Sequence, residues 1–303
     1  MTTEEDEIKV KIKSALVAMH YSRYDEAEGI LHDALRDADR CDSDPARDYI
    51  YDVLANLYYE KKDYDRAEKA FTVLTKKLIE EGTSPDAPAV VEISLKLADI
   101  YEQRGDFDKA ESGYIYAVEM QHKHVAREGR FKLVSKQTQF KEVNFDNVDH
   151  LALYGMCLEQ YSKFLVGQRR LEEAESQFRE AIEVALSIYG PLHSQPVIMM
   201  NNYSTKLLKQ KYYDTALLYL EQVVKKALHV HELDIMLPGF YCNLCEAQWH
   251  LGMRETALLT AEKALELAKK CNNSYVLDKT RDYVKALMMD YNNPTKSSVS
   301  EKS

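Results

Sequence analysis

The sequence predicts an all-α protein, a helical solenoid of about six elongated helix pairs with a capping helix at its C-terminal end. Two observations lead to this fold class. Only 10 glycines and 7 prolines occur in 303 residues, whereas sheets need more turn residues and more β-branched runs. In addition, one apolar pattern with helical spacing recurs six times along the chain, and such a recurrence is typical of stacked repeats.

The recurring pattern describes the second helix of each pair. A bulky residue is followed by Ala three positions later, by an apolar residue at seven, and by a small or apolar pair at ten and eleven, as in YDEAEGILHDAL from Tyr24. Successive copies start 40, 43, 64, 42 and 41 residues apart. The alanine is present in every copy, as Ala27, Ala67, Ala110, Ala174, Ala216 and Ala257.

A second small residue marks the first helix of each pair, nine positions before the bulky one. These residues are Ala15, Ala55, Ala98, Ser162, Ser204 and Cys245. Two helix axes approach to about 8 to 10 Å only where the side chains between them do not intrude. Short polar or glycine-containing links such as KKDY and RGDF separate the two helices, so we expect them to run antiparallel.

The elements follow in order from this pattern. We expect an acidic N-terminal tail over 1–7, repeat units near 8–40, 46–81, 89–122, 150–189, 195–231 and 236–271, a basic insertion over 121–146, a capping helix over 275–291 and a disordered tail over 292–303. The cap is expected because the last repeat of a solenoid needs a cover for its apolar end.

Composition excludes several classes of protein. A formal net charge of -10 argues against nucleic acid as a partner, because phosphate binding needs a concentrated basic surface. The longest apolar run, near 151–158, is far shorter than the roughly 18 residues of a membrane span. Five irregularly spaced cysteines favour a reducing compartment. The start, MTTEEDEIKV, is acidic where an import presequence is rich in Arg.

Several short motifs could suggest a catalytic, metal-binding or phosphate-binding site, but their positions in the predicted helices argue against each of them. His32 and Asp33 are adjacent in a helix, about 100° apart around its axis, so they do not face each other. Cys242 and Cys245 form a C-x-x-C inside a helix, without a second pair at zinc spacing. The glycines form no phosphate-binding loop. We therefore predict no catalytic residue, no cofactor and no metal, and expect that the protein is not an enzyme.

The predicted first helices carry a set of side chains suited to holding an extended peptide. Asn and Tyr bond a peptide backbone, and a Trp receives one of its side chains. The predicted peptide-binding groove consists of Tyr49, Asp52, Asn56 and Tyr59 of repeat two, Ile198, Asn201, Thr205 and Leu208 of repeat five, and Trp249 of repeat six. The alternative is that Tyr and Trp fill gaps in the core.

The insertion is basic on an acidic protein. Gln121 to Glu142 carries six Lys or Arg against two Glu. One interpretation is a solvated extension, and the other is a docking segment for an acidic partner or for anionic lipid. The docking segment would consist of Lys123, Arg127, Arg130, Lys132 and Lys136.

Replacing these five cations by Gln tests the docking interpretation. We expect weaker binding to vesicles that contain anionic lipid, measured by co-sedimentation in low salt, because each exposed cation near such a surface contributes about 1 kcal/mol. Unchanged binding would leave a solvated extension as the correct reading.

The repeat resembles the tetratricopeptide repeat. LKLADIYEQRGDFDKAESGYIYAV, from Leu95 to Val118, has the small residue followed by Gly-x-aromatic-x-x-Ala that is typical of that family. The spacing here exceeds the usual repeat of about 34 residues, and helices longer by about one turn each would account for it. The resemblance implies a curved solenoid whose concave face is built from the first helices.

Longer stretches resemble one mitochondrial family of tetratricopeptide-repeat proteins more specifically. They include AEGILHDAL at Ala27, EISLKLADIY at Glu92 and YGMCLEQYSKFL at Tyr154. The resemblance implies a mitochondrial inner-membrane factor for assembly or maintenance of respiratory complex III, the ubiquinol cytochrome c reductase. It also implies protein partners, namely complex III subunits and the Rieske iron-sulfur subunit, peripheral contact with the membrane and no catalytic residues.

A cytoplasmic adaptor similar to the kinesin light chain is the alternative. That family also uses repeats of about 42 residues, and PLHSQPVIMMNNY at Pro191 looks like its repeat junctions. The acidic start without a readable presequence agrees with this alternative, so the residues leave both readings open.

Overall fold

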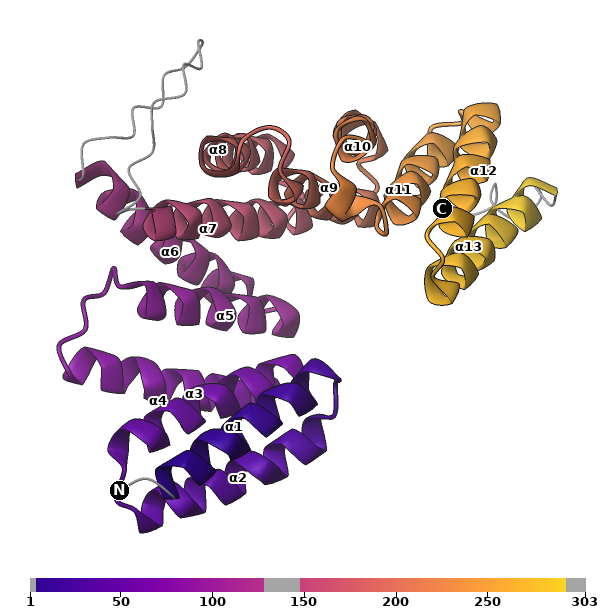
Figure 1. The fold of residues 1–303 in the computed structure, drawn as a ribbon. Helices are drawn as coiled ribbons and strands as arrows, with labels where there is room; N and C mark the ends of the chain where they lie inside the picture. Colours follow the sequence, from indigo (N-terminus) through magenta and orange to yellow (C-terminus); the bar gives the residue numbers. More distant parts are fainter. Residues whose placement is uncertain (1–3, 128–147, 293–303) are drawn as a thin grey trace. The chain divides into compact units, whose positions relative to one another are not determined.

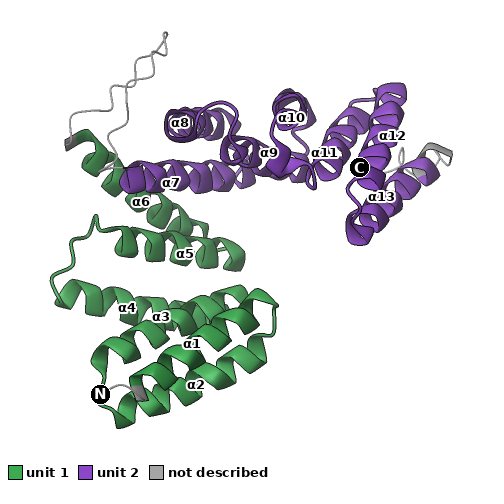
Figure 2. Ribbon diagram, viewed as in Figure 1, with its two compact units in different colours: residues 1–132 green, residues 133–303 purple. Residues whose placement is uncertain are grey.

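The computed structural model describes residues 4–127 and 148–292, and within these ranges the chain is helical and contains no strand (Figure 1). The predicted all-α solenoid is confirmed. The chain divides into two compact units, Met1–Lys132 and Leu133–Ser303 (Figure 2). Three helix pairs lie in each unit, and the capping helix follows the last pair.

The first unit consists of three pairs that follow one another in order. Its helices are α1 (Glu4–His20), α2 (Tyr24–Arg40), α3 (Asp44–Glu60), α4 (Tyr64–Glu80), α5 (Pro88–Arg104) and α6 (Phe107–Arg127). Two helices of 17 residues and two links of three residues account for the 40-residue spacing. The extra length relative to an ordinary repeat therefore lies in the helices.

The second unit contains the other three pairs and the cap. Its elements are α7 (Val148–Gly167), α8 (Leu171–Tyr189), α9 (Ser194–Lys209), α10 (Tyr213–Ala227), the short 3₁₀ helix η2 (His231–Leu233), α11 (Leu237–His250), α12 (Arg254–Lys270) and α13 (Ser274–Asn292). In this unit α13 packs on both α11 and α12, as a cap must.

One boundary differs from the prediction. The tail expected over residues 1–7 is wrong for residues 4–7, because α1 begins at Glu4. Acidic side chains stabilise a helix when they lie in its first turn, near the positive end of the helix dipole. The acidic run that looked like a tail is therefore a helix start. Most of the basic insertion and the last eleven residues, 293–303, lie outside the described residues.

The small residues of the repeat are the packing points of each pair. All six alanines of the second helices and all six small residues of the first helices have an exposed fraction of 0%. The two helices approach closely between α5 and α6, where a Cβ on Gly113 would lie 2.9 Å from the Cβ of Ala98. Side-chain size at these positions sets the distance between the helices of a pair.

The turn inside each pair has the same hydrogen bonds every time. After the first helix one residue adopts a left-handed conformation, with φ between 57° and 80°, and these residues are Ser22, Lys62, Gly105, Arg169, Lys211 and Gly252. The following amide then donates to a carbonyl of the last helical turn, as Asp63 N–H does to Tyr58 O at 2.9 Å. This is the Schellman arrangement, and it reverses the chain in three residues, or in two between α5 and α6.

Among the described residues of unit 2, the hydroxyl of Tyr203 is buried without a hydrogen-bond partner. The Tyr203 ring stacks on Phe178 with centroids 3.8 Å apart and meets Tyr219 edge-on at 5.4 Å. Burial raises the pKa of this hydroxyl, so it stays protonated. The ring stabilises the core by packing, whereas the hydroxyl gives up its hydrogen bonds to water on folding and forms none within the protein.

Gly113→Ala should destabilise the protein, although alanine is the better helix former by about 1 kcal/mol. The added methyl would meet Ala98, and such overpacking costs typically 1–3 kcal/mol. The matched control is Gly29→Ala on α2, where a Cβ meets nothing within 4 Å. Urea unfolding followed by circular dichroism should show Gly29→Ala more stable and Gly113→Ala less stable than the parent. Equal stabilisation by both changes would contradict the close approach.

Tyr203→Phe should leave the free energy of unfolding unchanged or raise it by up to about 1 kcal/mol, because it removes an unsatisfied hydroxyl. Tyr154→Phe in the same unit is the matched control, since the Tyr154 hydroxyl donates to Glu180 Oε1 at 2.5 Å. That change should cost about 1–3 kcal/mol by leaving a carboxylate without its donor. If thermal melts showed that both variants lose the same amount of stability, the Tyr203 hydroxyl could not be the unsatisfied group.

Candidate functional site

The candidate residues of repeat two lie on α3 and bond across to α5. Asn56 Nδ2 donates to Asp52 O at 2.8 Å, and its Oδ1 accepts from Lys96 Nζ at 2.5 Å. The Tyr59 hydroxyl donates to Asp99 Oδ2 at 2.6 Å. Tyr49 is 51% exposed. Three of the four predicted groove residues of this repeat are therefore engaged within the protein.

The bonds between α3 and α5 hold neighbouring repeats of unit 1 in register. Burial, and after it the bond to Asp99, raises the pKa of Tyr59, so the phenol remains a donor at every physiological pH. A peptide that used Asn56 or Tyr59 would have to replace hydrogen bonds that already exist. This face is better suited to aligning the repeats than to receiving a ligand.

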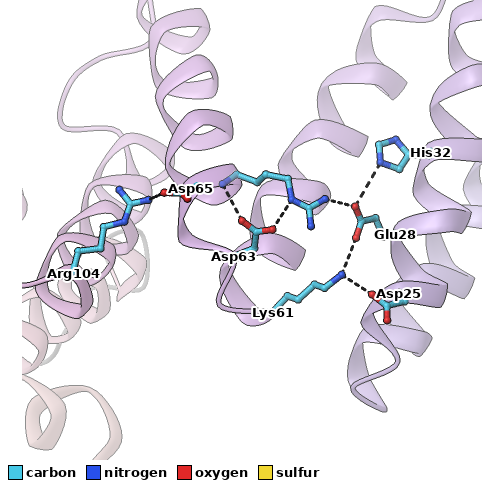
Figure 3. Close-up of polar contacts among 8 residues, drawn as sticks. Asp25, Glu28, His32, Lys61, Asp63, Asp65 and Arg104 are labelled. Atoms are coloured by element: carbon cyan, nitrogen blue, oxygen red, sulfur yellow. Dashed lines mark hydrogen bonds and ion pairs between the residues drawn. The ribbon is translucent and has the colours of Figure 1, made fainter.

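A hollow in unit 1 is lined mostly by charged residues. It encloses about 500 Å³ and is lined by Lys61, Lys62, Asp63, Tyr64, Asp65 and Arg104. Figure 3 shows that two of its three cations are engaged in ion pairs: Lys61 Nζ lies 2.5 Å from Asp25 and 3.1 Å from Glu28, and Arg104 pairs with Asp65. Arg104 also pairs with Glu68. Equivalent ion pairs thus join α3 to α2 and α5 to α4.

His32 lies at the edge of this ion-pair network and does not form a dyad with Asp33. Its Nε2 is 3.9 Å from Glu28 Oε1 (Figure 3), whereas Asp33 pairs with Arg36 on its own helix. Both Lys61 and Arg66 lower the pKa of Glu28, against an opposing effect of burial, which is the largest single influence. The network holds α2 against the next pair and has the geometry of a structural contact.

The candidate residues of repeat five are divided between core and surface. Leu208 was predicted to face the groove, and this is wrong, because it is 4% exposed and belongs to the core. The reason is its position four residues after Ser204, on the same side of α9 as that fully buried packing residue. Ile198 and Thr205 are half-buried, and Asn201 Oδ1 accepts from Asn243 Nδ2 at 2.8 Å.

Asn201 and Asn243 line a hollow in unit 2 that sequence reasoning did not find. It encloses about 310 Å³ and is lined by Asn201, Ile235, Met236, Gly239, Phe240, Asn243, Tyr275, Val276, Lys279 and Thr280. A volume of this order suits one or two side chains of a ligand. The wall combines apolar side chains, two amides and a single cation, Lys279, whose Nζ is 5.7 Å from the centroid of the Tyr275 ring.

Three helices and one link form the hollow. Asn201 comes from α9, Asn243 from α11, and Lys279 from the capping helix α13. Exposed Ile235 and Met236 come from the link between η2 and α11. The sequence shows two adjacent apolar residues ahead of a helix start, whereas their exposure and the contribution of the cap become visible only in the structure.

Trp249 lies elsewhere in the unit. It packs against the cluster of Cys245, Ala257, Ala261, Val284 and Leu287 that joins the last pair to the cap. The Arg254 guanidinium carbon lies 5.5 Å from its ring centroid. Trp249 does not line the hollow, and its packing matches the alternative reading in which the ring fills a gap in the core.

The predicted basic docking segment is described only at its start. Lys123 is on the exposed side of α6, 3.5 Å from Glu119, and Arg127 ends that helix. Arg130, Lys132 and Lys136 lie outside the described residues. Docking to an acidic partner or to anionic lipid therefore stays a prediction.

The C-x-x-C cysteines are part of the packing. Cys245 is fully buried, and its Sγ lies 3.1 Å from Ala257 O. Burial raises the pKa of Cys242 to about 12 and that of Cys245 to about 11. Both thiols stay protonated at neutral pH, and thiolate chemistry would be slow there. Across 4–127 and 148–292, no group of three or more potential metal ligands converges.

Helix pairs with small packing residues, three-residue turns and a cap define a tetratricopeptide-repeat solenoid. A tetratricopeptide repeat model matches residues 53–120. The fold is similar to that of BtubC (BKLC) from P. vanneervenii, with a TM-score of 0.57 and 18% identity over 90% of this chain and 94% of that one. A putative kinesin light chain from Podosopora anserina gives a TM-score of 0.56 at 14% identity, over 75% of this chain and 97% of that one. At these identities the likeness shows the fold alone.

Curated relatives show the particular family. The human protein named tetratricopeptide repeat protein 19, mitochondrial, is 30% identical over 267 residues, which are 88% of this chain and 68% of the relative. Its Drosophila melanogaster homologue is 28% identical over 89% of this chain and 72% of its own length. The chain belongs to the tetratricopeptide repeat protein 19 family. Fold and family together make it a protein-interaction scaffold.

None of the helices in the described ranges combines the length and the apolar character that crossing a bilayer requires.

Proposed function

We propose that this protein is a non-catalytic scaffold in mitochondria, at the inner membrane, that assembles or maintains respiratory complex III through contact with its Rieske iron-sulfur subunit. Membership of the tetratricopeptide repeat protein 19 family supports the proposal, because the curated relatives are named mitochondrial. The described residues also offer a surface for a protein partner and no arrangement of groups for catalysis.

The hollow of unit 2 is the observation that carries the interaction role. Asn201 and Asn243 bond each other through one Oδ1 and one Nδ2, so each amide retains groups that can bond a peptide backbone. Phe240, Met236 and Val276 provide an apolar wall. Lys279 is the only charged residue of the lining and is exposed. The partner that fits is an extended segment with an apolar side chain and a nearby carboxylate.

Two substitutions test this site without touching the core. Lys279→Glu reverses the charge, and Gly239→Leu fills the hollow from an exposed position where a Cβ meets nothing within 4 Å. In cells that lack the protein we expect lower complex III activity and less Rieske subunit in the complex. The parent chain should restore both, whereas each variant should restore them several-fold less well, because truncating or reversing an anchor costs about 2 kcal/mol.

The matched controls are Lys285→Glu, exposed on the same helix but outside the hollow, and Gly29→Leu, exposed on α2. Both should restore complex III as the parent does. Full rescue by Lys279→Glu and Gly239→Leu would rule out the hollow as the contact. A protein found only in the cytosol by fractionation, with complex III unaffected by its removal, would refute the mitochondrial role itself.

A further inference from the structure

Helix α1 has two apolar faces, and only one of them is packed. Ile8, Ile12, Ala15 and Met19 are buried against the rest of unit 1. A second row, defined here as the α1 stripe, consists of Val10, Ser14, Val17 and Tyr21, in which the three large residues are 62%, 52% and 66% exposed. Leu16, 40% exposed, lies on another side of the helix, at least about 100° around the axis from each residue of the stripe.

The repeat pattern identifies what this stripe is. Counted from the small packing residue of each first helix, Val10 and Val17 correspond to Ile50 and Leu57 of α3 and to Ile93 and Ile100 of α5. Those four residues are between 0% and 6% exposed, and in α3 and α5 this side meets the pair before it, as α2 meets α3 and α4 meets α5. The α1 stripe therefore corresponds to the face with which α3 and α5 pack on the preceding pair, but in α1 this face is exposed.

Tyr21 changes the chemistry of this face. The same position holds Lys61 at the end of α3 and Arg104 at the end of α5, and both pair with acidic residues of the preceding pair (Figure 3). In α1 the cation is replaced by an aromatic ring. The α1 stripe has thus lost the group that recognises an acidic second helix and has gained apolar surface.

The capping helix α13 exposes a different set of side chains. Its exposed residues include the charged Arg281, Asp282 and Lys285, together with Tyr275 and Met289. The α1 stripe exposes two valines and a tyrosine at the other end of the described chain. A contiguous row of large apolar side chains on one helix marks an interaction surface.

We propose that a second copy of this chain covers the α1 stripe, with the two α1 helices antiparallel about a twofold axis near Ser14. Ser14 lies in the middle of the stripe, and its hydroxyl donates to Val10 O at 3.0 Å, so the helices can approach there without leaving a polar group unsatisfied. Antiparallel pairing places Val10 of one copy against Val17 of the other. Such a contact is self-complementary, as a twofold interface must be.

The charges at the two ends of α1 agree with the antiparallel arrangement. The first turns carry Glu5, Asp6 and Glu7, and the other end carries His20 and Arg23, whose guanidinium also pairs with Glu26 of its own chain at 2.9 Å. About a twofold axis near Ser14 the acidic end of one copy faces the basic end of the other, whereas parallel helices would place like charges together. One helix from each copy is a small interface, so we expect a dissociation constant in the micromolar range, about 1–100 µM.

Sedimentation velocity of the full chain between about 5 and 200 µM tests the proposal. The parent should shift from monomer to dimer over this range. Val10→Lys and Val17→Glu, each made alone, should weaken dimerisation at least tenfold. Val73→Glu is the matched control, because Val73 is 67% exposed on α4 of the same unit, and this variant should behave as the parent.

Mixing the two variants tests the orientation. In an antiparallel pair, Lys at 10 in one copy meets Glu at 17 in the other, and the second contact keeps Val against Val, so the mixture should dimerise although each variant alone does not. A monomeric parent at 200 µM, or a dimer unaffected by Val17→Glu, would overturn the proposal. All three substitutions lie on exposed positions, and unchanged melting curves would show that the fold is intact.

Discussion

The close approach of the two helices in each pair is the constraint on which the rest of the structure depends. The twelve residues at these contacts have no exposed surface, and their identity varies among Ala, Ser and Cys while their size does not. Where the residue is polar, the helix itself satisfies it, as Ser162 and Ser204 show by donating to Glu159 O and Met200 O at 2.7 Å. The constraint is therefore steric, and it tolerates changes of chemistry.

Because the spacing is fixed, equivalent positions can carry different chemistry in the two units. The cation at the end of α3 and of α5 links successive pairs of unit 1, whereas Gln168, Gln210 and Leu251 take this place in unit 2. Unit 2 has instead the amide pair Asn201–Asn243 and an apolar hollow beside it. Ion pairs align the pairs of unit 1, whereas unit 2 carries the amide pair that we propose as part of a partner site.

The helix pairs could be predicted from the sequence because their signals are local. The packing alanines and the small residues recur at fixed positions, and the burial of all twelve follows from that spacing. The candidate groove could be predicted only in part. Asn201 was found from its place on α9, but Leu208 was misplaced because it shares the face of Ser204. Lys279 and Tyr275 were missed, since only the three-dimensional packing brings α13 beside α9 and α11.

The two proposed contact surfaces arise where the repeat pattern is interrupted. An inner first helix buries its stacking face on a neighbouring pair, so that its apolar residues, such as Ile50 and Leu57, are used up in the fold. The cap is a single helix in place of a pair, and the hollow lies beside it. The α1 stripe keeps the apolar residues of an inner helix without the cation. The regular positions of a solenoid are occupied by packing between neighbouring repeats. Contact surfaces are therefore expected at the positions that depart from the repeat, and both proposed surfaces lie there.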